Sequence, residues 1–181
     1  MTRKSLSVAA VACALALGAC GSDSSDTGQT APPPPGNGAD RAYVNAMLPL
    51  HEKAVAIAVV AQKRGNTFVK GIARQIAGEQ PPETARLRAI GAALFSAGVP
   101  VGTLGVAPST AAADADLAAL RTSKSFNTAF LQAMIPIHEA TIALCNAEIA
   151  KGDQVDLKTT AQAIIDTEKP QLASMKKRQN S

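Results

Sequence analysis

Residues 46–54, "AMLPLHEKA", and residues 133–141, "AMIPIHEAT", are nearly the same nine residues, and they contain the only two histidines of this 181-residue chain. The alignment that joins them also pairs an aromatic residue upstream, and Gly65 with Gly152 downstream. The chain from residue 40 onward is therefore an internal duplication. Each half continues beyond its glycine into a second helical pattern, with one residue more in the second connection.

Each half is predicted to be a helical hairpin. Its first helix carries a stripe of residues at alternating steps of four and three, which is the spacing of one helix face. The stripes are Tyr43, Met47, Leu50, Ala54, Ile57 and Ala61 in the first half, and Phe130, Met134, Ile137, Thr141, Leu144 and Glu148 in the second. Asp40 is placed as the N-cap of the first helix. Gly65 and Gly152, each preceded by basic residues, are placed as C-terminal caps.

A long connection, residues 98–122, separates repeat 1 at 40–97 from repeat 2 at 123–178. Its first part is rich in Gly, Pro and small residues, which disfavour a helix, and a short helical pattern follows around "DADLAALRTS". Two antiparallel hairpins joined by one long crossover predict an all-α four-helix bundle. The 142 residues of 40–181 are enough for one domain with its own core.

Prolines fall inside the predicted helices of both halves. Pro49 and Pro136 are expected to kink the first helix of each half, because each removes one backbone hydrogen bond. Pro81-Pro82 and Pro170 are expected to divide each second helix into two segments.

The N-terminal residues predict export and a lipid anchor. Basic residues precede a short apolar run within residues 1–19, as in a signal peptide. Leu17-Gly18-Ala19-Cys20 resembles the lipobox of bacterial lipoproteins, in which the cysteine is acylated, so Cys20 is the predicted lipidation site. Residues 20–39 are then the lipidated cysteine and a disordered Pro, Ser and Gly tether. We expect a membrane-anchored lipoprotein of the cell envelope, on the periplasmic or extracytoplasmic face.

Charge and composition exclude several functions. Without the two basic residues of the signal peptide the chain carries 16 basic and 14 acidic residues, which is too balanced to indicate nucleic-acid binding. A zinc-protease motif would need histidines where Val55 and Ile142 stand, and a di-iron Glu-x-x-His motif would need glutamates where Leu48 and Ile135 stand. We therefore expect a protein that is not an enzyme. Its protein partners are left open.

The duplicated motif is the candidate metal site. Met47 and His51 are four residues apart, as are Met134 and His138, so each thioether lies one helical turn from an imidazole. Apolar neighbours at helical spacing predict that both histidines are partly buried. If the halves pack about a pseudo-twofold axis, the two pairs form a nitrogen and sulfur set that suits copper. The alternative is that both histidines and both methionines serve only core packing.

Several other residues are candidates for supporting such a site. Glu52 and Glu139 follow the histidines directly and could orient the imidazoles or supply carboxylate ligands, or lie exposed on the polar flank. Cys145 lies on the same helix face as His138, but its counterpart in the first half is Ala58, which favours the role of a small buried residue. With the other two cysteines assigned to the signal peptide and the lipid anchor, Cys145 has no partner for a disulfide.

The chain resembles the DUF305 family of exported bacterial proteins. The resemblance covers nearly all of the mature domain and rests on these segments: "DRAYVNAMLPLHEKA", "IARQIAGEQPPETARL", "LAALRTSKSFNTAFLQAMIPIHEATIA" and "AQAIIDTEKPQLASM". It implies a ferritin-like four-helix bundle that binds or sequesters copper in the envelope, with Met175 where the family tends to have methionine. The family's paired histidines are here Leu50-His51 and Ile137-His138, so the first of each pair is missing. A metal-free structural or protein-interaction bundle is therefore the alternative.

Overall fold

The structure is a computed structural model that describes residues 35–181. Within this range the chain forms helices and no strand. The helices are α1 (Gly38–Arg64), α2 (Thr67–Ser96), α3 (Ala111–Asp114), α4 (Leu117–Thr122), α5 (Phe126–Lys151) and α6 (Val155–Gln179). The predicted all-α bundle of two hairpins joined by a long crossover is confirmed. Cys20 and the predicted signal peptide at 1–19 lie outside the described residues, as does most of the predicted tether.

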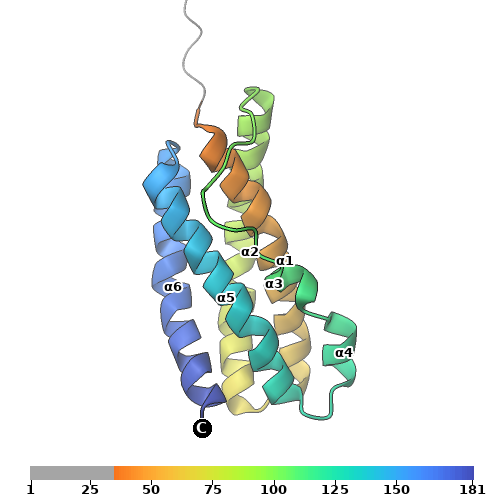
Figure 1. The fold of residues 1–181 in the computed structure, drawn as a ribbon. Helices are drawn as coiled ribbons and strands as arrows, with labels where there is room; N and C mark the ends of the chain where they lie inside the picture. The colour runs from red at the N-terminus through yellow and green to blue at the C-terminus, as the bar shows by residue number, and fades with distance from the viewer. Residues whose placement is uncertain (1–34) are drawn as a thin grey trace, which may run out of the picture. The chain divides into compact units, whose positions relative to one another are not determined.

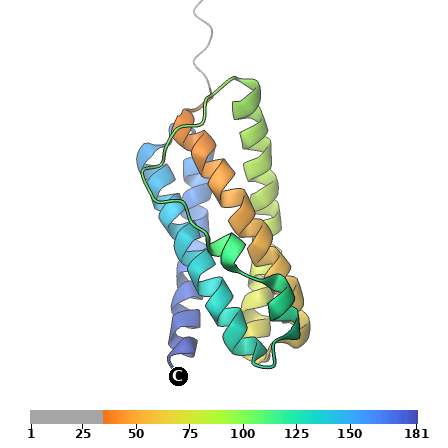
Figure 2. The same ribbon diagram turned by 45° about the vertical axis from the view of Figure 1, so that its right-hand side comes forward.

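The four long helices lie side by side, with α1 paired with α2 and α5 paired with α6 (Figure 1). The two hairpins meet through α1 and α5, which run antiparallel, since Asn37 Nδ2 at the start of α1 donates a hydrogen bond to the carbonyl of Lys151 at the end of α5 (2.8 Å). The crossover runs along the bundle, and its short helices α3 and α4 contact both α1 and α5 (Figure 2).

The core is built from the predicted stripes. Every stripe residue of the two halves is buried, including Thr141 and Glu148. His51 and His138 are fully buried, not partly buried as expected, at 0 % exposure each. The reason is that the second helices of the hairpins supply polar side chains toward both histidines, which covers the helix face that the sequence pattern left open.

The first helix begins earlier than predicted. The N-cap is Asn37 rather than Asp40, because the Asn37 side chain accepts hydrogen bonds from the backbone N–H groups of Ala39 (2.8 Å) and Asp40 (3.1 Å). Asp40 is the third helical residue and accepts a hydrogen bond from the Asn37 N–H, which completes a capping box. The predicted caps Gly65 and Gly152 are confirmed at the ends of α1 and α5.

The prolines do not divide the second helices. The prediction that Pro81-Pro82 and Pro170 interrupt them is wrong, because α2 and α6 each continue as one helix through those residues. A proline removes only its own N–H from the helix ladder, and buried side chains on both sides of it can retain the packing. Gln80 and Thr84 show this in α2, where both are buried although two prolines stand between them.

A buried carboxyl pair joins three helix ends. Glu148, which breaks the apolar stripe of α5, lies fully buried beside Asp40 of α1. Asp40 also accepts hydrogen bonds from the backbone N–H groups of Asp153 (3.1 Å) and Gln154 (3.0 Å), just before α6. Burial, with the hydrogen bond to Asp40 and its charge, raises the pKa of Glu148 to about 8. Burial also raises the pKa of Asp40, but its hydrogen bonds from Glu148 and from the backbone outweigh this and lower it.

Substituting Gly152 tests how tightly this pair is packed. A Cβ at Gly152 would lie 2.6 Å from Asp40 Oδ1 and closer still to Glu148 Oε1, so Gly152→Ala should lower the free energy of unfolding by about 1–3 kcal/mol. The matched control is Gly71→Ala inside α2, where a Cβ meets nothing within 4 Å. That variant should be more stable by about 0.5–1 kcal/mol, because alanine favours the helix. Urea unfolding of both variants measures the difference, and equal stabilities would contradict the close packing.

Candidate functional site

A cluster of polar side chains lies inside the bundle, and we refer to it as the polar centre. It draws residues from all four long helices, and apart from Glu83 each of them is buried. Its members are His51 of α1, Gln80 and Glu83 of α2, His138 of α5, and Glu168 and Gln171 of α6. Because buried polar groups are costly unless they are paired, such a cluster indicates either a complete hydrogen-bond network or a binding site.

His51 lies between two carboxyl groups. Its Nδ1 is 3.8 Å from Glu83 Oε2 and its Nε2 is 3.7 Å from Glu168 Oε1, both longer than a hydrogen bond. Burial, together with the charge of His138, lowers the pKa of His51 to about 4. His51 is therefore neutral at pH 7, and neither contact is an ion pair.

The two carboxyl groups beside His51 hold their protons unusually well. Burial and the charge of Glu79 raise the pKa of Glu83 to about 7. Burial and the charge of Glu83 raise the pKa of Glu168 well above its usual value, although a hydrogen bond from Gln80 Nε2 (2.7 Å) favours the ionised form. A set of acidic groups that resist ionisation, grouped around a neutral imidazole, is typical of functional sites.

His138 is held in a different way. Its Nε2 lies 3.0 Å from Gln171 Oε1, and Gln171 Nε2 donates to Glu79 Oε2 (2.8 Å). Because the bond to Glu79 uses the amide nitrogen, the Gln171 oxygen faces His138 and accepts from an Nε2–H. Burial lowers the pKa of His138, so it too is neutral at pH 7. The two histidines of the duplicated motif are thus not equivalent.

The polar centre has more acceptors than donors. Among residues 35–181, several of its atoms are shielded from solvent and have no hydrogen-bond partner. They are both ring nitrogens of His51, Gln80 Oε1, His138 Nδ1 and Glu168 Oε2. An unsatisfied buried polar group lowers the stability of the folded chain by about 1–3 kcal/mol. A bound proton or cation would therefore stabilise the polar centre. The centre is nevertheless not a preformed metal cage, since no group of three His, Cys, Asp or Glu side chains in 35–181 converges on one point.

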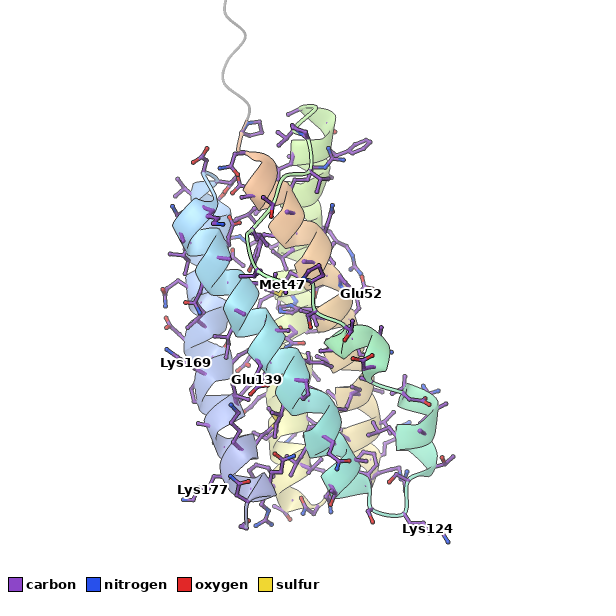
Figure 3. The ribbon with its side chains drawn as sticks, in the orientation of Figure 1. Met47, Glu52, Lys124, Glu139, Lys169 and Lys177 are labelled. Atoms are coloured by element: carbon purple, nitrogen blue, oxygen red, sulfur yellow. The ribbon has the colours of Figure 1, made fainter. Side chains whose placement is uncertain are left out.

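The structure places the predicted sulfur ligands in the core. Met47 and Met134 are fully buried, like the histidines that follow them by one turn. Within the described part of the chain no hydrogen bond joins either sulfur to an imidazole nitrogen. Met47 is labelled in Figure 3, on α1. Both thioethers thus lie one helical turn before a histidine of the polar centre, while the recorded contacts of the histidine ring nitrogens are to oxygen atoms.

Two of the predicted supporting residues lie on the surface. Arg88 donates to Glu52 (2.6 Å) and Lys176 pairs with Glu139 (2.6 Å), and all four side chains are about half exposed. Figure 3 labels Glu52 on α1 and Glu139 on α5. The expectation that these glutamates orient the imidazoles is thus replaced by the alternative of an exposed polar flank. A residue that directly follows a buried helical residue points about 100° away from it, which explains the result.

The other two supporting residues are buried. Met175 is fully buried in α6. Cys145 is also buried, and its Sγ lies 3.3 Å from the Tyr43 hydroxyl. Burial raises the pKa of the Cys145 thiol to about 12, so it stays protonated and unreactive. Cys145 therefore serves the core rather than the chemistry of the polar centre.

Sequence reasoning did not assign the amide and carboxyl residues of α2 and α6 to the site. With the extra residue of the second connection, Gln80 corresponds to Glu168 and Glu83 corresponds to Gln171. The first half thus reads Gln-x-x-Glu where the second half reads Glu-x-x-Gln. The signal was a polar residue on a buried face at the same place in each half, and the exchange of amide for carboxyl concealed it.

Comparisons with known proteins support the fold. The family model described as "Domain of unknown function (DUF305)" matches residues 40–178. The structure of CopM in the Cu(I)-bound form is 24% identical with a TM-score of 0.63, and the match covers 76% of this chain and 93% of that chain. CopM in the Cu(II)-bound form is 22% identical with a TM-score of 0.66, covering 78% and 95%. A DUF305 fragment from Deinococcus radiodurans is 22% identical with a TM-score of 0.63, covering 81% and 99%. No functionally curated protein matches this chain.

Proposed function

Because this chain belongs to the DUF305 family, as the match over residues 40–178 shows, we propose that it binds copper in the polar centre of its bundle. The observation that carries the proposal is His51, which is fully buried between two carboxyl groups with neither ring nitrogen hydrogen-bonded within residues 35–181. An imidazole in that state is a ready ligand for a transition metal. The donors of the duplicated motif are His51 and His138, with Met47 and Met134 as the available thioethers.

The proposed setting is the cell envelope. We propose that a lipid on Cys20 anchors the protein to a membrane, and that the bundle then sequesters or hands on copper at the periplasmic or extracytoplasmic face. The support is the sequence of residues 1–20, with basic residues, a short apolar run and a lipobox-like end. The chain has no arrangement that predicts catalysis, so this role is one of binding. Structures of CopM with Cu(I), Cu(II) and Ag bound add support, since that protein shares the fold.

One observation favours the alternative, a metal-free structural or interaction bundle. Within residues 35–181 the His, Cys, Asp and Glu side chains do not form a group of three that could hold a metal as they stand. On this alternative both histidines are neutral polar residues of the core. The hydrogen bond from His138 to Gln171 then serves to hold α5 against α6.

Thermal unfolding with and without copper separates the two functions. Residues 33–181 form one compact unit and can be studied without the N-terminal segment. A ligand that binds only the native state raises its stability, by about 2.7 kcal/mol at a hundred times the dissociation constant. We expect Cu(I) or Cu(II) to raise the melting temperature, and the His51→Ala, His138→Ala double variant to abolish the rise.

The control for this experiment is the Glu52→Ala, Glu139→Ala double variant, which changes the exposed neighbours of both histidines. It should keep the full response to copper. If the wild-type bundle shows no response, or if the double histidine variant responds equally, copper binding in the polar centre is excluded and the metal-free function stands.

A further inference from the structure

Three adjacent side chains of α1, α2 and α6 carry buried polar atoms without a hydrogen-bond partner. His51 Nε2, Gln80 Oε1 and Glu168 Oε2 are shielded from solvent, and none has a hydrogen-bond partner in the described part of the chain. The three side chains are adjacent, since Glu168 Oε1 accepts from Gln80 Nε2 (2.7 Å) and lies 3.7 Å from His51 Nε2. They come from three different helices and are at most 2 % exposed.

When Glu168 is ionised this group lacks hydrogen-bond donors, so either a proton on Glu168 or a bound cation supplies the missing positive charge. An amide oxygen and a carboxylate oxygen are acceptors only, and a neutral imidazole presents a lone pair on one of its nitrogens. The 3.7 Å between His51 Nε2 and Glu168 Oε1 is too long for a hydrogen bond. Two ligands that are each about 2.1 Å from a shared metal ion stand about 3.4 Å apart at a tetrahedral angle and up to about 4.2 Å apart when opposite. The observed separation falls inside that interval.

We propose that His51 Nε2, the Glu168 carboxylate and Gln80 Oε1 hold a divalent transition-metal ion, Cu(II) or Zn(II). This inference rests on the proposed function and narrows it, because it keeps His51 as a donor, replaces the other donors of the duplicated motif by Glu168 and Gln80, and fixes the charge of the ion. One nitrogen and two or more oxygens suit a borderline divalent cation, whereas Cu(I) and Ag(I) favour sulfur. The thioethers of Met47 and Met134 are then core side chains and not ligands.

Glu83 is the positioning residue of this site. It faces the opposite edge of the imidazole, with Oε2 3.8 Å from Nδ1. A carboxylate at that edge favours a proton on Nδ1, which leaves the lone pair on Nε2 directed at the ion. His138 Nε2 is engaged by Gln171 (3.0 Å), so this arrangement uses the Nε2 of His51 and not that of His138.

The test is a titration of residues 33–181 with Cu(II), Zn(II) and Cu(I) in turn, on the wild type, Glu168→Gln and Met47→Leu, Met134→Leu variants. We expect Glu168→Gln to weaken Cu(II) and Zn(II) binding by about 10–100-fold or more, which is the loss already typical of second-sphere partners. The double methionine variant should bind both divalent ions as the wild type does. Glu139→Gln, an exposed carboxylate on α5, is the matched control and should change nothing.

The outcomes separate the inference from the proposed function. Copper binding that survives Glu168→Gln but is lost in the double methionine variant overturns this inference and leaves the proposed function standing. No binding of any of the three ions by the wild type overturns both. If circular dichroism shows that Glu168→Gln does not fold, the electron paramagnetic resonance spectrum of wild-type Cu(II) decides. Coupling to one nitrogen with oxygen ligands supports the inference, and sulfur ligation overturns it.

Discussion

The Glu148→Gln variant should become more stable than the wild type as the pH rises, with the two nearly equal at pH 5 and the variant ahead by about 3 kcal/mol at pH 9. The cause is the carboxyl pair at the end of the bundle, where burial and Asp40 raise the pKa of Glu148 to about 8. One pKa unit corresponds to about 1.4 kcal/mol, so the full shift is worth about 5 kcal/mol, which relaxation around the ionised group reduces.

The direction follows from where the proton is bound. Glu148 has a higher pKa in the folded chain than the ordinary 4.5, so its contribution to stability is complete below pH 4.5 and is lost as the pH rises through about 8. Asp40 has a lowered pKa, so its contribution is present above its ordinary value of 3.8 and is lost only as the pH falls through its folded pKa. Between these limits Glu148 keeps its proton while Asp40 is ionised. A glutamine at 148 keeps a donor there at every pH.

Urea unfolding at pH 5, 7 and 9 measures this effect, since the difference between the two proteins cancels the titration of the polar centre. Asp153 raises the pKa of Glu148 and Lys158 lowers it, so both flanking charges must be left unchanged. Glu139→Gln is the control, because Glu139 is an exposed carboxyl in an ion pair with Lys176. Parallel pH curves for Glu148→Gln and the wild type would mean that Glu148 is ionised in the native protein.

Removing the partner carboxylate should be the most damaging single change at this end of the bundle. Asp40→Ala is expected to lower the free energy of unfolding by about 3–5 kcal/mol at pH 7. Its carboxylate accepts N–H groups from Asn37, Asp153 (3.1 Å) and Gln154 (3.0 Å), and hydrogen bonds to a charged group contribute about 1.5–3 kcal/mol each. These bonds connect the start of α1 to the start of α6, which are far apart in the sequence.

Asp116→Ala is the matched control for this variant. Asp116 also accepts two backbone N–H groups, those of Ala118 (2.8 Å) and Ala119 (3.0 Å), but it caps only the short helix α4 of the crossover. That variant should lose much less stability than Asp40→Ala, because Asp116 is exposed and caps only its own short helix. Chemical denaturation of both proteins at pH 7 gives the comparison, and equal losses would show that Asp40 acts only as a local cap.

The bundle could be predicted because the sequence patterns that indicate it are local and occur in both halves. The stripes of α1 and α5 are buried along their whole length, and Gly65 and Gly152 end these helices as predicted. The errors also have local causes. Asn37 lies in a segment whose Pro and Gly content indicates a tether, so its capping role was not visible. The effect of a proline on helix continuity was overestimated, because the tertiary packing that offsets it cannot be read from the spacing of residues in the sequence.

The candidate site could be predicted only in part. The duplication identified His51 and His138, and both lie in the polar centre. Their contacts come from α2 and α6, and contacts between helices that are distant in sequence have no spacing rule that reveals them. Glu52 and Glu139 were chosen because they adjoin the histidines in sequence, while Glu83 and Glu168 adjoin them in space. Partners in a helical bundle are found across helices rather than along them.

The first half has an amide, Gln80, where the second half has a carboxyl group, Glu168. This difference affects how the two hairpins can pair. In the intact chain Gln80 of one hairpin meets Glu168 of the other, and the amide donates to the carboxyl group (2.7 Å). Two copies of the first hairpin, paired in the same way, would set amide against amide, and two copies of the second would set carboxyl against carboxyl. Two ionised carboxylates repel each other, whereas an amide can donate to a carboxylate, so we expect a separately expressed second hairpin to associate with the first hairpin rather than with itself.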